Sequence, residues 1–256
     1  EVMAVLLLQA GIGAVAFRTL VPIAIIVCVL MAIVVTSYRQ TIMAYPSGGG
    51  AYIVSRENLG TIPALVAGSS LLVDYILTVA VSVAGGVLAI RTAVGFDHKW
   101  TVPVCLLCVF IMTVMNLRGV KEAGKAFAFP TYFFIGCMLI VFGMGFWRLS
   151  QGTLPTLATD LPGAVELGQE QGLLTGAAIF ILLRAFANGG SSLTGLEAIS
   201  DGVALFKAPE HVNAKRTLVI MSTLLGTLVL GVSYFAHHIH AMPYESGVPT
   251  VISQIA

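Results

Sequence analysis

An aspartate interrupts one of the longest apolar stretches of the sequence. Asp74 has sixteen uncharged residues on each side. A lone carboxylate at the middle of a bilayer costs on the order of 2.5–3.5 kcal/mol, so such residues are commonly functional. On a helix, Asp74, Thr78 and Ser82 follow one another at intervals of four and line one face. Tyr75 lies beside this stripe, and the four oxygen-bearing side chains predict an ion or proton site. Without the aspartate, the two hydroxyls would equally suit a hydrogen-bonded seam between helices.

A second polar anomaly is the segment 186–201, FANGGSSLTGLEAISD. Adjacent glycines flanked by asparagine and serines disfavour a regular helix. We therefore expect the helix to unwind near 188–192, at Asn188, Gly189 and Gly190. Backbone freed at that depth must line a cavity or be buried in protein. Broken helices at the membrane midplane are where secondary transporters bind their substrates.

Two polar side chains follow the expected break on one helix face. Thr194 and Glu197 are three residues apart, and Asp201 lies one turn further on. We interpret Thr194 and Glu197 as candidate ion ligands. The structural alternative is a Gly hinge in which Glu197 pairs with Arg184, although a buried ion pair contributes little stability.

The composition identifies the environment of these residues. Of 256 residues, 57% are apolar and 10% are charged, whereas soluble domains average about 25% charged. The chain is therefore an integral membrane protein, and its net charge of +1 argues against nucleic acid as a partner. The cysteines lie in apolar runs, and the single CxxC lacks the further ligands of a metal site. No cofactor is expected. The four cysteines are Cys28, Cys105, Cys108 and Cys137.

Uncharged stretches long enough to cross a bilayer, about 20 residues each, predict an all-α transmembrane domain over 1–256. We expect six full spans and a partial span at 1–17, and a fragment of a longer polytopic protein. The full spans are expected at about 19–38, 61–90, 100–117, 126–148, 172–204 and 217–240.

Loop charges predict the orientation of these spans. One set of connections carries eight Lys and Arg residues and the opposite set carries four. The positive-inside rule therefore places the loops 39–60, 118–125 and 205–216 in the cytoplasm. The acidic connection 149–170 is expected outside. In the first cytoplasmic loop, the glycines of AYPSGGGAY indicate a tight turn, and the absence of a following Lys-Ser/Thr argues against a phosphate-binding loop.

Several motifs together resemble the amino acid–polyamine–organocation (APC) superfamily of permeases. The segment 38–60 is similar to the loop between the second and third helices of that superfamily, and 188–196 is similar to its broken sixth helix. The combination of SYRQT, AYPSGGGAYIVSRENLG and VDYILTVAVSVAGG is more specific. It resembles the KimA-type potassium importers within the superfamily, and the resemblance covers nearly the whole chain.

The resemblance implies a LeuT-type fold of two inverted repeats of five helices, of which this chain would hold most of the first and the start of the second. It also implies a potassium site formed by the third helix and the broken sixth helix. The family's acid and tyrosine on the unwound first helix are expected to precede this chain. The positions that match the family's site are Asp74, Tyr75, Thr78, Ser82, Thr194 and Glu197.

We therefore expect a multi-pass secondary transporter of the plasma membrane that imports potassium by proton symport. Asp74, Thr78 and Thr194 are the expected ligands, and Glu197 is expected to carry the coupled proton. Potassium, protons and the lipid bilayer are the expected partners, and the sequence does not decide whether the protein forms a homodimer. The alternative is a proton- or sodium-coupled amino-acid permease of the same superfamily.

Two other classes fit the sequence poorly. An intramembrane enzyme could use Asp74 and Glu197 as paired carboxylates, but the chain has no Gly-x-Gly-Asp, HExxH or GxSxG motif. A potassium channel would need a repeated carbonyl filter, and no such repeat is present in the sequence.

Overall fold

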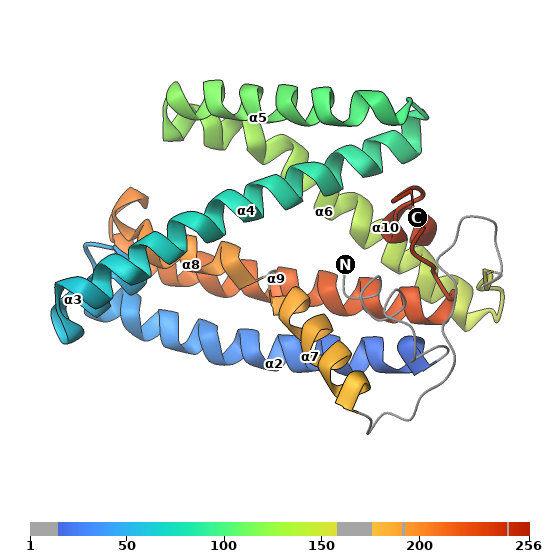
Figure 1. The fold of residues 1–256 in the computed structure, drawn as a ribbon, viewed down its shortest axis with the longest axis horizontal. Coiled ribbons are helices and arrows are strands. Elements are labelled where there is room, and N and C mark those ends of the chain that lie inside the picture. The colour runs from blue at the N-terminus through green and yellow to red at the C-terminus, as the bar shows by residue number, and fades with distance from the viewer. Residues whose placement is uncertain (1–14, 158–175, 191–192, 245) are drawn as a thin grey trace. The chain divides into compact units, whose positions relative to one another are not determined.

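The computed structural model describes residues 15–157, 176–190, 193–244 and 246–256. These residues form α-helices with short 3-10 turns, and the described part contains no strand (Figure 1). Residues 1–14 of the expected partial span, residues 158–170 of the connection expected outside, and residues 171–175 at the start of the next expected span lie beyond the described ranges. In chain order the elements are α2 (Val15–Ala44), α3 (Gly50–Leu59), α4 (Thr61–Val94), η1 (His98–Trp100), α5 (Thr101–Leu117), α6 (Val120–Ser150), α7 (Gly176–Gly190), α8 (Thr194–Asp201), η3 (Val203–Leu205), α9 (Glu210–His238) and α10 (Val251–Ile255).

Five helices among the described residues are long and apolar enough to cross a membrane. Their large apolar side chains are widely exposed, as Leu106, Leu107 and Phe110 of α5 illustrate with exposed fractions of 55–65%. Apolar patches of this extent on a folded chain indicate a lipid-facing surface. The expectation of an all-helical membrane protein is therefore confirmed. The five spans are Leu20–Ala44, Thr61–Val94, His98–Leu117, Ala123–Ser150 and Glu210–His238.

The remaining expected full span, 172–204, contains two shorter helices in its described part. There, α7 runs to Gly190 and α8 begins at Thr194, with eight residues in α8. The structure differs from the prediction at Asn188, Gly189 and Gly190, which form the last turn of α7. Glycine is common where a helix ends, and the regular helix of α7 includes these three residues and ends at Gly190. Residues 191–192, the rest of the expected break, lie outside the described ranges.

Several helices extend beyond the spans expected from uncharged stretches. α2 continues to Ala44, α6 begins at Val120 and α9 begins at Glu210. A count of uncharged residues finds the part of a helix that suits the bilayer core. It misses polar turns that continue into the interface, because charged residues there cost little.

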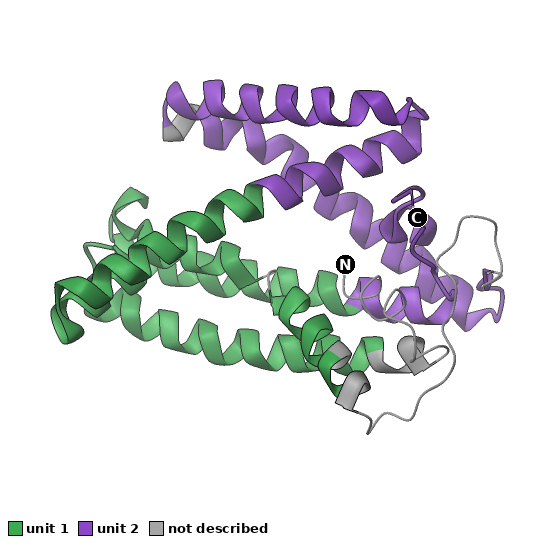
Figure 2. Cartoon of the chain, in the orientation of Figure 1, with its two compact units in different colours: residues 1–79, 168–230 green, residues 80–167, 231–256 purple. Residues whose placement is uncertain are grey.

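The chain divides into two compact units, coloured separately in Figure 2. The first consists of residues 1–79 and 168–230, and the second consists of residues 80–167 and 231–256. The division falls within α4, after Val79, and within α9, after Leu230.

The core of the first unit lies between α2, α8 and the first part of α9. Apolar side chains from these helices and from η3 pack together, and the α2–α9 packing is close at Gly226, whose carbonyl lies 3.9 Å from the Cys28 Sγ. This core fixes α8 against α2, which matters for the polar residues that both helices carry. The buried members are Met31, Val35, Ile42, Leu196, Ile199, Val203, Ala214 and Leu218.

In the second unit, α6 and the end of α9 pack through glycines and aromatic rings. A Cβ at Gly145 of α6 would lie 2.5 Å from the Phe235 ring, and a Cβ at Gly231 of α9 would overlap the Phe142 ring. The two phenylalanine rings stack with centroids 5.7 Å apart. Each helix therefore provides a glycine that accommodates a ring of the other, so that the two helices approach closely.

Candidate functional site

The predicted polar stripe of α4 is present on one continuous helix, Thr61–Val94. Asp74, Tyr75 and Thr78 are partly buried within the first unit. Ser82 is exposed and belongs to the second unit. The structure therefore groups the first three candidates with the residues of α8, whereas it does not bring Ser82 to that group.

The predicted candidates of α8 lie in its first turn. Thr194 is the first residue of the helix, and Glu197 is partly buried one turn later. Glu197 is close enough to Asp74 of α4 and to Asp201 of α8 for their charges to repel. The structure thus brings together two acids that the sequence separates widely, Asp74 and Glu197, within one unit.

Two tyrosines that belong to different helices contact these acids. The Tyr38 side chain of α2 lies near the Glu197 carboxylate, close enough for the two groups to interact. The Tyr75 hydroxyl of α4 donates a hydrogen bond to the Asp201 Oδ2, 2.5 Å away. Tyrosines of α2 and α4 thus lie beside the two acids of α8.

Sequence reasoning did not select Tyr38 or Asp201 for the site. Each lies at the end of an apolar stretch, where polar residues are ordinary. Asp201 follows Glu197 by one helical turn, and that spacing was the available signal. The contact of Tyr38 with Glu197 depends on the packing of α2 against α8, which no local pattern shows.

The three carboxylates have no basic partner in the part of the chain that the structure describes. The one salt bridge found there joins Lys99 to Asp97 at 3.0 Å, with both side chains exposed. Arg184, the partner in the structural alternative, is exposed on α7 and forms no ion pair with Glu197. Uncompensated carboxylates at partly buried positions are costly, and a bound cation or proton would relieve that cost.

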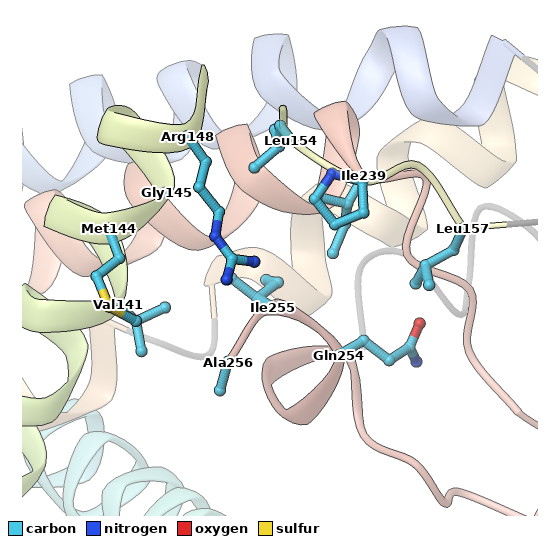
Figure 3. Close-up of a pocket in the computed structure, with 11 residues that line it drawn as sticks. Val141, Met144, Gly145, Arg148, Leu154, Leu157, Ile239, Gln254, Ile255 and Ala256 are labelled. Atoms are coloured by element: carbon cyan, nitrogen blue, oxygen red, sulfur yellow. The ribbon is translucent and has the colours of Figure 1, made fainter. Parts of the chain in front are cut away.

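A separate pocket lies in the second unit and contains none of the predicted site residues. It is formed by α6, the chain after α6, the residues after α9 and α10, and Arg148 extends into it (Figure 3). At its edge, the Gln254 side chain bonds both backbone groups of Met242, at 3.0 and 2.6 Å. The acids of the first unit, rather than this pocket, carry the predicted chemistry.

A family model for amino acid permeases matches residues 3–254. The chain belongs to this family, and the predicted resemblance to the APC superfamily is confirmed. Its members are transporters rather than enzymes, and the chain is a multi-pass protein of the plasma membrane.

Characterised relatives specify the comparison further. The chain is 43% identical over 254 residues to the potassium transporter KimA of Bacillus subtilis (strain 168). The alignment covers 98% of this chain and 40% of that protein. The chain is 24% identical over 209 residues to the low-affinity putrescine importer PlaP of Escherichia coli (strain K12), covering 80% of this chain and 44% of that protein.

A third relative is a plant protein. The chain is 26% identical over 160 residues to the chloroplastic cationic amino acid transporter 6 of Arabidopsis thaliana, covering 57% of this chain and 27% of that protein. The chain thus spans less than half the length of each of these three relatives.

Proposed function

We propose that the protein imports potassium by secondary active transport coupled to protons. The ion is held between α4 and α8, and Glu197 carries the coupled proton. The proposed ion ligands are Asp74 and Thr78 of α4 and Thr194 and Glu197 of α8.

The uncompensated acids of the first unit carry this proposal. Glu197 lies within electrostatic range of both Asp74 and Asp201, and the described residues place no cation beside these acids. Mutual repulsion at partly buried positions favours any event that adds positive charge. Binding of a monovalent cation and uptake of a proton are two such events, and a symporter performs both.

The position of Glu197 suits a group that gains and loses a proton during transport. It lies in the first turn of α8, where the helix dipole favours negative charge, and Tyr38 can donate to its carboxylate. Partial burial of the carboxylate opposes that charge most, and repulsion from Asp201 and Asp74 adds to it. Because these influences oppose one another, a small movement of α8 relative to α2 or α4 would change the proton affinity of Glu197.

The choice of potassium over an organic cation is supported by sequence similarity. Carboxylates would also attract the amines of putrescine or of a cationic amino acid. The identity to KimA is 43% over nearly the whole chain, against 24–26% for the relatives named for organic cations. Hydroxyl and carboxylate oxygens also match the preference of hard alkali cations for oxygen ligands.

A permease for amino acids or polyamines is the second candidate. The matching family model and the putrescine importer favour it. In that case, Asp74 and Glu197 would bind the substrate's ammonium group, and Thr194 at the start of α8 would lie near its carboxylate.

Growth and uptake experiments with the complete protein as its gene encodes it separate the two candidates. Cells deficient in potassium uptake receive wild type or the Asp74→Asn variant, with membrane expression measured for both. Growth of the wild type alone at low potassium is expected. Putrescine, lysine and alanine are then added as competitors of potassium uptake. Failure of wild type to rescue growth, together with uptake of labelled lysine or putrescine, would replace potassium import with the permease.

A further inference from the structure

We propose that Asp201 is a positioning residue of the transport site: it anchors the hydroxyl of Tyr75, which precedes Thr78 and follows Asp74 on α4, and the glycine turn at residues 48–50 fixes Asp201. This inference rests on the proposed function, because it assigns the glycines of AYPSGGGAY and the second acid of α8 to the same site. Neither feature belongs to the proposed ion ligands.

The link between Asp201 and the α4 stripe is direct. The Tyr75 hydroxyl donates to the Asp201 Oδ2 over 2.5 Å. Tyr75 is adjacent to Asp74 in sequence and one turn from Thr78, all on α4. A hydrogen bond that anchors the Tyr75 ring therefore restricts the rotation of α4 about its axis, and with it the direction of the Asp74 and Thr78 side chains.

The glycine turn contacts both the backbone and the carboxylate of Asp201. The Gly49 N–H donates to the Asp201 carbonyl oxygen over 3.0 Å. A Cβ at Gly48 would lie 2.5 Å from that same oxygen, and a Cβ at Gly50 would overlap the Asp201 Oδ1. All three glycines have positive φ, at 82°, 96° and 42°, which other residues adopt only with strain. The turn thus has the shape that admits Asp201 this closely.

The start of α3 provides the electrostatic complement. Gly50 is the first residue of α3, and the positive end of a helix dipole favours an adjacent negative charge. The Asp201 Oδ1 lies there, buried and without a hydrogen-bond partner among the described residues. One carboxylate oxygen therefore lies against the start of α3, and the other accepts a hydrogen bond from Tyr75. This arrangement leaves the carboxylate little freedom to turn away from Tyr75.

A pair of side-chain variants tests whether Asp201 acts through Tyr75. Tyr75→Phe removes only the donating hydroxyl, and Asp201→Asn removes the charge at constant size. In the complete protein, each is expected to raise the half-saturation concentration for potassium about tenfold, the scale of one hydrogen bond to a charged group, with a smaller change in maximal rate. The double variant is expected to be no worse than the more affected single variant.

Independent action would overturn the inference. If the effects of Tyr75→Phe and Asp201→Asn multiply in the double variant, Asp201 does not act through Tyr75. Unchanged half-saturation in the well-expressed Asp201→Asn protein would have the same meaning. If Asp201→Asn fails to reach the membrane, unchanged half-saturation in Tyr75→Phe alone would also overturn it.

Two glycines that flank α3 provide a matched test of the turn. Gly50 and Gly60 both have positive φ, at 42° and 96°, but no atom lies within 4 Å of a Cβ built at Gly60. Gly50→Ala should displace the Asp201 carboxylate and raise the half-saturation concentration as Asp201→Asn does. Gly60→Ala introduces backbone strain without a steric contact, so it should leave the half-saturation concentration near the wild-type value. Equal effects of the two alanines, or none from Gly50→Ala, would contradict the role of the turn.

The proposed function and this inference can fail separately. Absence of potassium uptake by wild type would reject potassium import, and the same variants would then be compared with labelled lysine or putrescine, whichever the wild type carries. Potassium uptake that depends on Asp74, combined with multiplying effects of the Tyr75 and Asp201 variants, would retain the proposed function and reject only the positioning role.

Discussion

Tyr38 of α2 and Glu197 of α8 are neighbours in the first unit, close enough for their side chains to interact. The two helices also share the apolar core of the first unit, so the contact is held by packing as well as by the polar groups. Glu197 is the acid proposed to carry the coupled proton. This contact connects it to α2, which provides no other proposed site residue. A change in the charge of Glu197 would therefore change its interaction with Tyr38 of α2 as well as its interaction with Asp74 of α4.

Replacement of Glu197 by glutamine tests the proton-carrying role. Glutamine resembles the protonated acid in size and cannot release a proton. Glu197→Gln is expected to lower uptake driven by a pH gradient at least about tenfold and to make the remaining uptake independent of external pH. Uptake by reconstituted vesicles, with and without the gradient, measures this. Tyr38→Phe keeps the carboxylate and should retain coupling, whereas unchanged coupling in Glu197→Gln would rule out the role.

The hydroxyl of Thr78 is expected to contribute to ion binding. Thr78→Ala should raise the half-saturation concentration for potassium about tenfold, equivalent to ~1.4 kcal/mol of binding free energy, because it removes one oxygen from the α4 stripe. The control is Thr113→Ala in α5, where an exposed hydroxyl only bonds the Val109 carbonyl of its own helix at 2.8 Å. Concentration-dependent uptake of a potassium analogue measures both. Equal half-saturation in the two variants would remove Thr78 from the ligand set.

The contact of α6 with the end of α9 should not tolerate a larger residue at its glycines. A methyl group at Gly145 or Gly231 would enter space that a Phe ring occupies, and overpacking of this kind costs about 1–3 kcal/mol. Gly231→Ala and Gly145→Ala are therefore expected to lower the thermal midpoint of the detergent-solubilised protein. Gly136→Ala, on the same helix α6 but with no atom within 4 Å of a built Cβ, should leave it unchanged. A similar midpoint in all three variants would show that the Phe142 and Phe235 rings can move aside without loss of stability.

The hydroxyl of Ser200 is expected to be dispensable for stability. Ser200 is 1% exposed, and its Oγ has no hydrogen-bond partner among the described residues. Removal of an unpaired buried hydroxyl is neutral or stabilising, so Ser200→Ala should keep or raise the thermal midpoint and preserve transport. This variant also controls for disturbance of α8 in the Asp201 experiments. A lower midpoint would indicate that the hydroxyl bonds a group beyond the described residues.

The sequence was sufficient to predict an all-helical membrane chain and to place Asp74, Tyr75 and Thr78 on one long helix. Both follow from local properties: the length of uncharged stretches and the helical spacing of Asp74 and Thr78. Glu197 was found for the same reason, since an acid in a long apolar segment is conspicuous without any knowledge of its neighbours. Membership of the permease family likewise followed from short motifs.

The parts of the site that depend on contacts between distant segments were not predictable. The glycines at 48–50 indicated a turn, but the close approach of Asp201 to Gly48 and Gly50 from α8 could not be read from that local pattern. Tyr38 was assigned to the end of a span, although it contacts Glu197. The end of α7 was placed too early, because Asn188 and the glycines after it disfavour a long helix but are compatible with its last turn.

The distribution of the acids along the chain has a consequence for how the protein is made. Asp74 belongs to α4, whereas Glu197 and Asp201 belong to α8, which the ribosome synthesises much later. During synthesis α4 must therefore enter the bilayer with its carboxylate but without α8. The insertion cost of that carboxylate, on the order of 2.5–3.5 kcal/mol, has to be offset by the many Leu, Ile and Val residues of α4 itself, at about 0.3–0.6 kcal/mol each near the bilayer centre. The strongly apolar composition of α4 is thus a requirement of biogenesis as much as of the finished transporter.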